Sequence, residues 1–437
     1  MTFDTIIIGG GLSGLTAGIA LQQRGQKVAI AAYGQSTLSS FSGSLDLLGY
    51  DAEGNIVDKP LEAIAALGKE HPYSKIGAEC TAQLAKEAVE LLAAAGVKLK
   101  GDGICNHLRI TPMGVAKPAW LTLDDCLTAD PKFQILNFKF HVLNIAGFLD
   151  FPVEFIAAGL EKMGAQVTVH TVPIKTLQSK RKSPYETRAT SIARLMEQDE
   201  ELCHFAESIA AVCTAEEEKN FPPARGGVTC KVEGEGAPAS IVLLPAVLGL
   251  ANDEALQKLR RLVGRPVYVI ATLPPSLLGA RLQSQLRSRF TALGGKIYFD
   301  TKIVSGTIED NRIVSVSRGY SSAISADNYI LATGSFQSHG LVAGYQRVVE
   351  PLFGLNVDYA ANRSAWTAPD IFAAQPYMTF GVHTDADFHP LKGKASIDNL
   401  YAIGSILSGH NALTQADGTG VSLITALAAA KNILNKK

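Results

Sequence analysis

A glycine-rich segment close to the N-terminus constrains the fold of this chain more than any other feature. Residues 3–8 form a short apolar run, and Gly9, Gly11 and Gly14 follow it in the pattern G-x-G-x-x-G. The first glycine permits a tight turn, the second lets backbone N–H groups approach a phosphate, and the third lets a helix pack closely on the strand. A helix expected over residues 13–23 presents its positive N-terminus to that phosphate. The segment therefore predicts a nucleotide-binding strand–helix unit.

The next strand departs from the usual dinucleotide site. It is expected over residues 27–32, and an Asp or Glu at its end usually binds the ribose hydroxyls of an adenosine. Ala32 stands there instead, and the nearest acid, Asp46, lies beyond a serine-rich loop. The missing carboxylate argues against NAD and against FAD held in the usual way, and it leaves a mononucleotide flavin possible. The loop, residues 36–44, either contacts the phosphate or the flavin or is an ordinary Ser/Gly loop.

Three later segments complete a flavoprotein pattern. Residues 399–405 read as a strand that ends in glycine, and residues 417–422 then open the last helix, expected over 420–434. The positive N-terminus of that helix would then point toward the end of the strand at 399–405, where it suits the electron-rich N1–O2 edge of a reduced flavin. Residues 332–334, Ala-Thr-Gly, close another strand. The residues predicted to contact the flavin are Gly9, Gly11, Leu12, Ser13 and Gly14; Ser42, Gly43 and Ser44; Thr333 and Gly334; and Gly404, Gly418, Gly420 and Val421.

The pattern of strands and helices predicts an α/β protein with more than one domain. At 437 residues the chain exceeds the length at which one hydrophobic core stops growing. We expect a Rossmann-like, FAD/NAD(P)-binding-type three-layer flavin domain built from residues 1–100, 276–345 and 378–437, with an α/β cap domain, residues 101–275, inserted between. Residues 60–70 show helical spacing, and residues 214–239 are rich in charge, Pro and Gly, which favours an exposed excursion.

Composition excludes several classes of function. The net charge is −1, so no basic surface is expected for nucleic acid. None of the six cysteines lies in a C-x-x-C pair, so we expect no metal site or iron–sulfur cluster, and onward electron transfer would need another protein. The N-terminus lacks the features of a signal peptide, and the apolar run at 239–251 is too short to cross a bilayer. We expect a soluble chain, or one attached to a membrane through a partner.

Three polar residues are candidates for alcohol chemistry beside a flavin. Oxidation of a secondary alcohol needs a base for the hydroxyl proton, and a phosphorylated substrate favours an Arg. His410 lies between the two C-terminal glycine segments, and His383 precedes the strand at 400. Arg281 follows two prolines at the start of a helix, where it either binds an anion or forms a surface salt bridge. The remaining histidines, including His71, are assigned structural roles.

Several longer motifs carry a family resemblance. They are FDTIIIGGGLSGL at 3–15, FSGSLDLL at 41–48, HPYS at 71–74, RITPMG at 109–114, GFLDF at 147–151, TLPPSLLGARLQ at 272–283, ATGSF at 332–336 and NLYAIGS at 399–405. With these motifs the sequence closely resembles the B-subunit family of bacterial anaerobic glycerol-3-phosphate dehydrogenase. The matching segments extend along almost the whole chain.

The resemblance implies a function and a set of partners. It implies an FMN-bearing subunit of a complex that oxidises sn-glycerol 3-phosphate to dihydroxyacetone phosphate and passes electrons to quinone. The implied partners are an FAD-bearing A subunit, together with an iron–sulfur membrane-anchor C subunit, which would hold the chain at the cytoplasmic face of the inner membrane. Within such a complex, this chain either oxidises the substrate or relays electrons. Two other hypotheses are a stand-alone fumarate-reductase-like or 2-hydroxyacid flavoenzyme, and a non-catalytic assembly subunit with a vestigial nucleotide fold.

Overall fold

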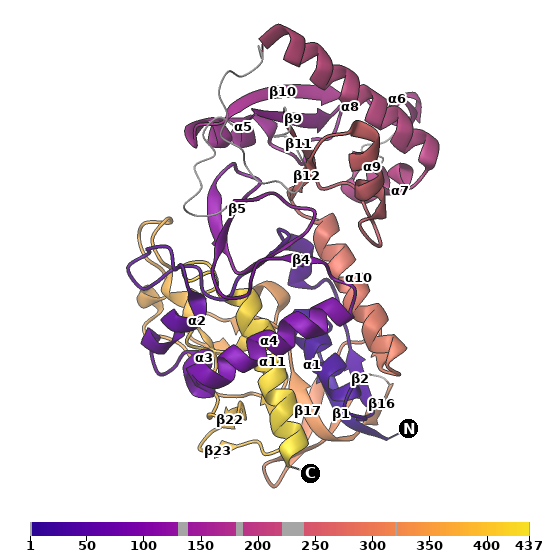
Figure 1. Ribbon diagram of the computed structural model, residues 1–437. Coiled ribbons are helices and arrows are strands. Elements are labelled where there is room, and N and C mark those ends of the chain that lie inside the picture. The colour runs from indigo at the N-terminus through magenta and orange to yellow at the C-terminus, as the bar shows by residue number, and fades with distance from the viewer. Residues whose placement is uncertain (1, 130–138, 181–186, 221–239, 320, 437) are drawn as a thin grey trace.

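The computed structural model describes residues 2–129, 139–180, 187–220, 240–319 and 321–436. Figure 1 shows two layered α/β regions joined by a smaller β region that contains β5. Both termini lie in the region built on the first strand of the chain. Within the described chain, none of the helices combines the length and apolar composition needed to cross a bilayer.

The first region is built on a five-stranded parallel sheet. Its strand order is β13 (Lys296–Tyr298), β2 (Val28–Ala31), β1 (Phe3–Ile8), β17 (Ala326–Leu331) and β24 (Leu400–Ala402). The central strand is buried on both faces, as its run of three isoleucines requires. Because these strands are parallel, the carboxyl ends of β1, β17 and β24 meet at one edge, where ligands of open α/β sheets bind.

Helices cover one face of this sheet and an antiparallel meander lies beside it. The helices are α1 (Leu12–Gln22), α4 (Ala78–Ala94), α10 (Leu277–Ala292) and α11 (Gly418–Asn435), and Figure 1 shows α11 passing beside α1 and α4. The meander comprises β14 (Ser305–Glu309), β15 (Arg312–Arg318) and β16 (Ser321–Ile324). Small residues permit the close packing: a Cβ on Gly18 of α1 would lie 2.8 Å from the Phe290 ring of α10. The predicted α/β class with a three-layer nucleotide-binding unit is confirmed.

The second region is a four-stranded parallel sheet with its own helices. Its strand order is β10 (Gln166–Val172), β9 (Lys139–Ile145), β11 (Ile241–Pro245) and β12 (Val267–Ile270). The helices are α5 (Val153–Lys162), α6 (Lys175–Lys180), α7 (Ala189–Met196), α8 (Asp199–Asn220) and α9 (Glu254–Val263). The start of the predicted excursion, residues 214–220, belongs to α8, and the rest of it lies outside the described residues.

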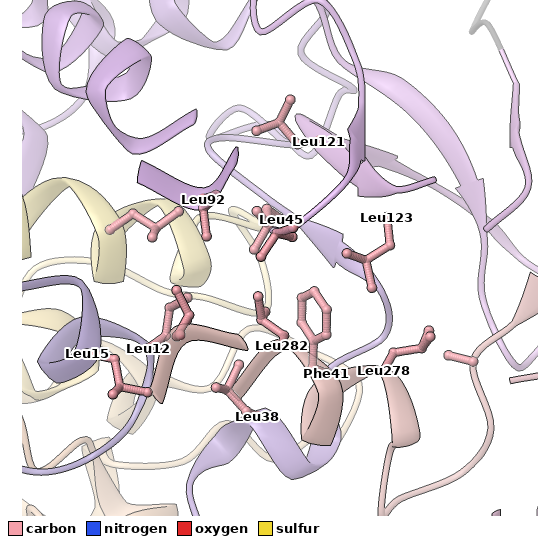
Figure 2. Close-up of a cluster of buried hydrophobic side chains, with 14 of the residues drawn as sticks. Leu12, Leu15, Leu38, Phe41, Leu45, Leu92, Leu121, Leu123, Leu278 and Leu282 are labelled. Carbon is pink, nitrogen blue, oxygen red and sulfur yellow. The ribbon is translucent and has the colours of Figure 1, made fainter. Parts of the chain in front are cut away.

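Two small antiparallel sheets join the regions. One has the order β3 (Ser44–Leu45), β7 (Leu121–Leu123) and β4 (Leu99–Lys100), and the other has the order β6 (Ala116–Ala119), β5 (His107–Ile110) and β8 (Thr128–Ala129). Strand β7 thus pairs with β3 and β4, which come from the first 100 residues, so residues 121–123 are bonded to the first region. Figure 2 shows the apolar core at this junction, where Leu12 of α1, Leu45 of β3, Leu123 of β7 and Leu282 of α10 lie close together.

The remaining elements are short. They are α2 (Pro60–Ala63), α3 (Pro72–Ile76), β18 (Val342–Ala343), β19 (Val348–Val349), β20 (Val357–Asp358), β21 (Gly381–Val382), β22 (Leu391–Lys392) and β23 (Ala395–Ser396), with 3₁₀ turns at Thr37–Ser40, Ile64–Ala66, Phe336–Ser338, Arg363–Ala365, Pro376–Thr379 and Gly404–Ile406. The helix expected over 60–70 is therefore wrong in extent, because α2 tightens into a 3₁₀ turn after Ala63 and the chain extends at Leu67.

Candidate functional site

The glycines of the N-terminal fingerprint have different surroundings in the structure. A Cβ on Gly9 would lie 2.1 Å from the Ala332 carbonyl oxygen, and one on Gly14 would lie 2.0 Å from the Gly9 carbonyl oxygen. Both positions therefore admit only glycine. Gly11 differs, because its Cβ would meet only the Ser36 Cβ at an ordinary 3.7 Å. The outer side of Gly11, at the N-terminus of α1, is the side left open to a ligand.

The N-terminus of α1 has the electrostatics of an anion site. Gly11 is the N-cap residue, so no side chain caps the helix, and the first turn carries no acidic residue. Free N–H groups at a helix start, with the partial positive charge of the helix, favour a phosphate. The Gln283 side chain of α10 fixes the loop around it, donating to the Gly10 carbonyl oxygen at 3.2 Å and to the Ser36 Oγ at 2.9 Å.

The other predicted flavin contacts gather at the same edge of the sheet. A Cβ on Gly404 would lie 2.3 Å from the Ser13 Oγ, and Gly404 itself donates to the Thr425 Oγ1 of α11 at 2.9 Å. The hydroxyls of Thr333 and Ser338 are buried and have no hydrogen-bond partner among the described residues. Buried hydroxyls without a partner are rare in folded proteins, and a bound polar group at this edge would satisfy them.

The serine-rich loop leads from this edge to the start of α11. It ends in β3, where the Ser44 and Thr122 hydroxyls lie 3.1 Å apart. Just beyond, the Asp46 carbonyl oxygen accepts from the Gly420 N–H at 2.7 Å and from the Thr419 Oγ1 at 3.0 Å. The predicted contacts at 42–44 and 418–421 therefore meet through Asp46. Val421 is fully buried, so it contributes to packing at this junction.

A buried histidine–aspartate–histidine cluster lies at the N-cap of α11. The Asp417 Oδ1 lies 3.2 Å from the His410 Nδ1, and its Oδ2 lies 2.9 Å from the His71 Nε2. The exposed fractions are 0% for Asp417, 2% for His71 and 4% for His410. Burial acts to raise the pKa of the Asp417 carboxyl, but the charge of His410 and the hydrogen bonds from both histidines outweigh it and hold that pKa well below its usual range.

The contacts of the two histidines assign their proton positions. The His71 Nδ1 accepts from the Tyr73 backbone N–H at 3.1 Å, so the proton of a neutral His71 is on Nε2, where it faces Asp417. His410 donates its Nδ1 proton to the same carboxylate, so its Nε2 is the nitrogen left to accept a proton. Asp417 therefore orients the His410 ring and leaves its Nε2 free to accept a proton, as a general base requires. His71 was not expected at this site from the sequence; the signal that could have found it is the HPYS motif, where Pro72 begins α3 and His71 caps it.

Asp46 is a second acidic group at this site. Its Oδ1 is buried and has no hydrogen-bond partner within the described chain. Burial, the largest influence, raises the pKa of Asp46 to about 6; the negative charge of Asp417 adds to the rise, whereas Arg109 and Lys117 oppose it. Asp46 therefore changes charge close to neutral pH, beside a carboxylate that does not.

Asp46 predicts a pH dependence of stability. Its folded pKa of about 6 lies above the unfolded value, so the carboxylate destabilises the fold increasingly as pH rises from 4 to 6, by about 3 kcal/mol once it is fully ionised. We expect Asp46→Asn to unfold at higher denaturant than the natural protein at pH 8 and at nearly the same denaturant at pH 4. Glu53→Gln, an exposed control, should follow the natural protein throughout. Equal pH dependence in Asp46→Asn and the natural protein would contradict the assignment.

His383 and Arg281 lie apart from the Asp417 cluster. His383 is partly exposed, and its Nδ1 lies 2.9 Å from the Asp358 Oδ2, in a shallow groove next to β20. Arg281 is buried, forms an ion pair with Asp125 and donates to the Gly249 and Asn252 carbonyl oxygens. These contacts join α10 to the second region. They favour a structural role for Arg281, and its role as an anion ligand stays a prediction without support from the geometry.

The Arg281–Asp125 pair predicts a large effect on stability. Removing one member of a buried ion pair leaves the other charged and buried, which costs about 3–5 kcal/mol. We expect Arg281→Met to lower the free energy of unfolding by about that amount, while the double variant Arg281→Met/Asp125→Leu recovers most of the loss. Both variants should retain the cofactor affinity of the natural protein. A stable Arg281→Met protein with weakened anion binding would instead support the ligand role.

The residues at the sheet edge fit a flavin nucleotide. Gly11 and the first turn of α1 would hold its phosphate, Thr333 and Ser338 offer unused hydroxyls, and the N-terminus of α11 faces the same edge. This is the arrangement expected for a phosphate and a polar ring system bound along the carboxyl ends of parallel strands.

Comparisons with known proteins identify the family. The family described as "FAD binding domain" matches residues 4–421. The chain is 39% identical to the B subunit of anaerobic glycerol-3-phosphate dehydrogenase from Yersinia enterocolitica, over 100% of this chain and 99% of that protein. It is 35% identical to the protein of the same name from Pectobacterium atrosepticum, again over 100% and 99%. The chain therefore belongs to the FAD-binding domain family of flavoproteins and, within it, to the B-subunit family of anaerobic glycerol-3-phosphate dehydrogenase.

Proposed function

We propose that this chain is the flavin-bearing B subunit of an anaerobic glycerol-3-phosphate dehydrogenase complex. In that role it oxidises sn-glycerol 3-phosphate to dihydroxyacetone phosphate, and the electrons pass to quinone through partner subunits. The observation that carries the proposal is the identity of up to 39%, over the full length, with relatives that bear this name. The buried base cluster beside the glycine-lined edge supplies the chemistry that such a reaction needs.

His410 is proposed as the base. Oxidation of a secondary alcohol removes the hydroxyl proton as hydride leaves the carbon, and the flavin, when bound, supplies the hydride acceptor. His410 Nε2 takes the hydroxyl proton, because Asp417 occupies its Nδ1. Asp417 holds the imidazole in this tautomer and stabilises the imidazolium that forms. His71 fixes the second oxygen of the carboxylate, so the cluster keeps one geometry during the proton transfer. His383 remains a weaker candidate because it lies outside the cluster.

We propose FMN as the flavin, with FAD as the alternative. The support is Ala32, which follows β2 at the position where a dinucleotide site usually has its ribose-binding carboxylate. Denaturing the purified protein and identifying the released flavin by mass decides the choice. Recovered FMN supports the proposal, whereas recovered FAD overturns the cofactor choice and leaves the proposed reaction in place.

The proposal includes partners and a location. An FAD-bearing A subunit would complete the electron path together with an iron–sulfur C subunit, which would also hold this chain at the cytoplasmic face of the inner membrane. We further propose that residues 1–100, 276–345 and 378–437 form the flavin domain and that residues 101–275 form the cap. Strand β7 would then be the part of the cap that extends the flavin domain.

Anaerobic addition of sn-glycerol 3-phosphate tests the function. The flavin bound to this chain should lose its oxidised absorbance, either in the isolated chain or once the partner subunits are added. Bleaching by fumarate-type or 2-hydroxyacid substrates instead would favour the stand-alone flavoenzyme. A colourless protein that takes up neither FMN nor FAD would favour an assembly subunit with a vestigial nucleotide fold.

A further inference from the structure

A row of two cationic side chains and one hydroxyl crosses the small sheet between the two regions. Arg109 of β5 is the register partner of Lys117 on β6 and of Thr128 on β8. Directly opposed residues of antiparallel strands project from the same face, so the three side chains stand side by side. Like charges placed opposite each other destabilise a strand pair. Two cations so placed favour a negative charge close by, whether the Asp46 carboxylate or a bound anion.

The polar groups of this row have unused hydrogen-bonding capacity. The Arg109 Nε is buried and has no hydrogen-bond partner among the described residues. Lys117 is exposed, so its ammonium can move to meet a ligand. A guanidinium fork, an ammonium and a hydroxyl are the donors that phosphate oxygens accept from. Arg281, the arginine expected from the sequence to bind an anion, already has its guanidinium bonded to Asp125 and to backbone carbonyl oxygens.

The row adjoins the base cluster. A Cβ on Gly49 would lie 3.1 Å from the Pro118 Cγ of β6 and 2.8 Å from the Ala416 Cβ, so β6 lies next to the segment that leads into Asp417. The positive charges of Arg109 and Lys117 both act on the Asp46 carboxyl. The negative charge of Asp417 also raises the pKa of Asp46, and Asp417 contacts both His410 and His71. A small molecule with a phosphate at one end could therefore bind the row and present its hydroxyl groups toward His410. The RITPMG motif, which begins at Arg109, has no other role in the site.

We propose that Arg109, Lys117 and Thr128 bind the phosphate group of a phosphorylated polyol, an assignment that rests on the proposed function for the identity of the substrate. Arg109 binds two phosphate oxygens through its fork, Lys117 neutralises the second charge, and Thr128 donates its hydroxyl. The binding energy of the phosphate thus positions the carbon chain of the substrate for the base. Unphosphorylated glycerol, which lacks this anchor, is a poor ligand.

Binding and kinetics of three variants test the proposal. The probes are inorganic phosphate and sn-glycerol 3-phosphate, titrated into the flavin-loaded protein. Charge-assisted hydrogen bonds contribute about 1.5–3 kcal/mol each, so Arg109→Gln should weaken binding of both probes about 10- to 100-fold. Lys117→Met, at an exposed position that leaves the fold intact, should weaken both probes about 10-fold and raise KM more than it lowers kcat. Lys392→Met, an exposed cation on the β22–β23 hairpin, is the matched control and should match the natural protein.

The outcomes separate this proposal from the proposed function. Weaker binding of both probes in Lys117→Met and Arg109→Gln supports the phosphate site, even if the flavin is never reduced by the substrate. Unchanged binding in Lys117→Met and Arg109→Gln, or no phosphate binding by the natural protein, overturns it. Reduction of the flavin by sn-glycerol 3-phosphate with the same KM in all variants would overturn the phosphate site and leave the proposed function standing.

Discussion

A Gly11→Val variant is expected to fold normally and to lose its flavin. Its Cβ would meet only the Ser36 Cβ at 3.7 Å, so the backbone tolerates a side chain there. The same side chain would stand where the phosphate approaches the first turn of α1 and would block one or two hydrogen bonds to it. At about 1.5–3 kcal/mol for each charge-assisted bond, flavin affinity should fall about 100-fold. Fluorescence titration of the flavin-free protein measures the affinity, and circular dichroism checks the fold.

Two other glycine variants make this prediction specific. Gly68→Val places the same side chain in an exposed loop with nothing within 4 Å, so it should bind flavin like the natural protein. Gly14→Ala should behave in the opposite way to Gly11→Val. Its Cβ would lie 2.0 Å from the Gly9 carbonyl oxygen, so we expect a loss of about 1–3 kcal/mol in unfolding free energy. Full flavin retention in Gly11→Val would mean that the phosphate lies elsewhere.

Asp417→Asn is expected to abolish most of the activity while leaving the flavin bound. The carboxamide offers one oxygen and one NH₂ group, so it cannot accept from both His71 and His410. If its oxygen keeps the bond to His71, its NH₂ faces the His410 Nδ1, which must then lose its proton. The proton moves to Nε2, and the base is blocked. Loss of general-base catalysis should lower kcat roughly 10²- to 10⁴-fold.

The Asp358–His383 pair provides a matched control. It has the same residue types and a similar distance, 2.9 Å, but both side chains are partly exposed. Asp358→Asn should therefore change kcat less than about threefold, because exposed pairs of this kind contribute at most about 1 kcal/mol. The natural flavin absorbance in both variants would show that the cofactor site is intact. If Asp358→Asn proved the more damaging change, His383 would replace His410 as the base.

The parts of the fold set by local sequence could be predicted. The first strand, α1 and the glycines between them depend on contacts within a few residues, and the structure has them where they were expected. Strand β24, which ends two residues before Gly404, and the final helix are equally local. The helix expected over 60–70 was shortened, because the chain turns at Ile64–Ala66 and extends at Leu67 before Gly68. The spacing of apolar residues alone does not predict where such a helix ends.

The site depended on contacts that are distant in the sequence. His71 and Asp417 are separated by 346 positions, and Arg281 and Asp125 by 156. No spacing rule links such residues, so His71 received a structural role and Arg281 was considered as an anion ligand. His410 could be placed because it lies seven residues from Asp417 on the same segment. The sequence placed Asp46 only as an acid too far from the end of β2 to bind a ribose, because its burial beside α11 depends on how the sheet edge closes.

Reduction of this chain's own flavin by substrate shows whether this chain oxidises sn-glycerol 3-phosphate itself. The complex would be mixed anaerobically with sn-glycerol 3-phosphate, and the absorbance of the flavin bound to this chain would be followed through a single turnover. We expect this flavin to be reduced first, and we expect deuterium at C2 of the substrate to slow its bleaching. We also expect His410→Gln, with its flavin still bound, to react far more slowly. Reduction of the partner's flavin first, with the flavin of this chain following at a rate that deuterium and His410→Gln leave unchanged, would contradict oxidation of the substrate by this chain.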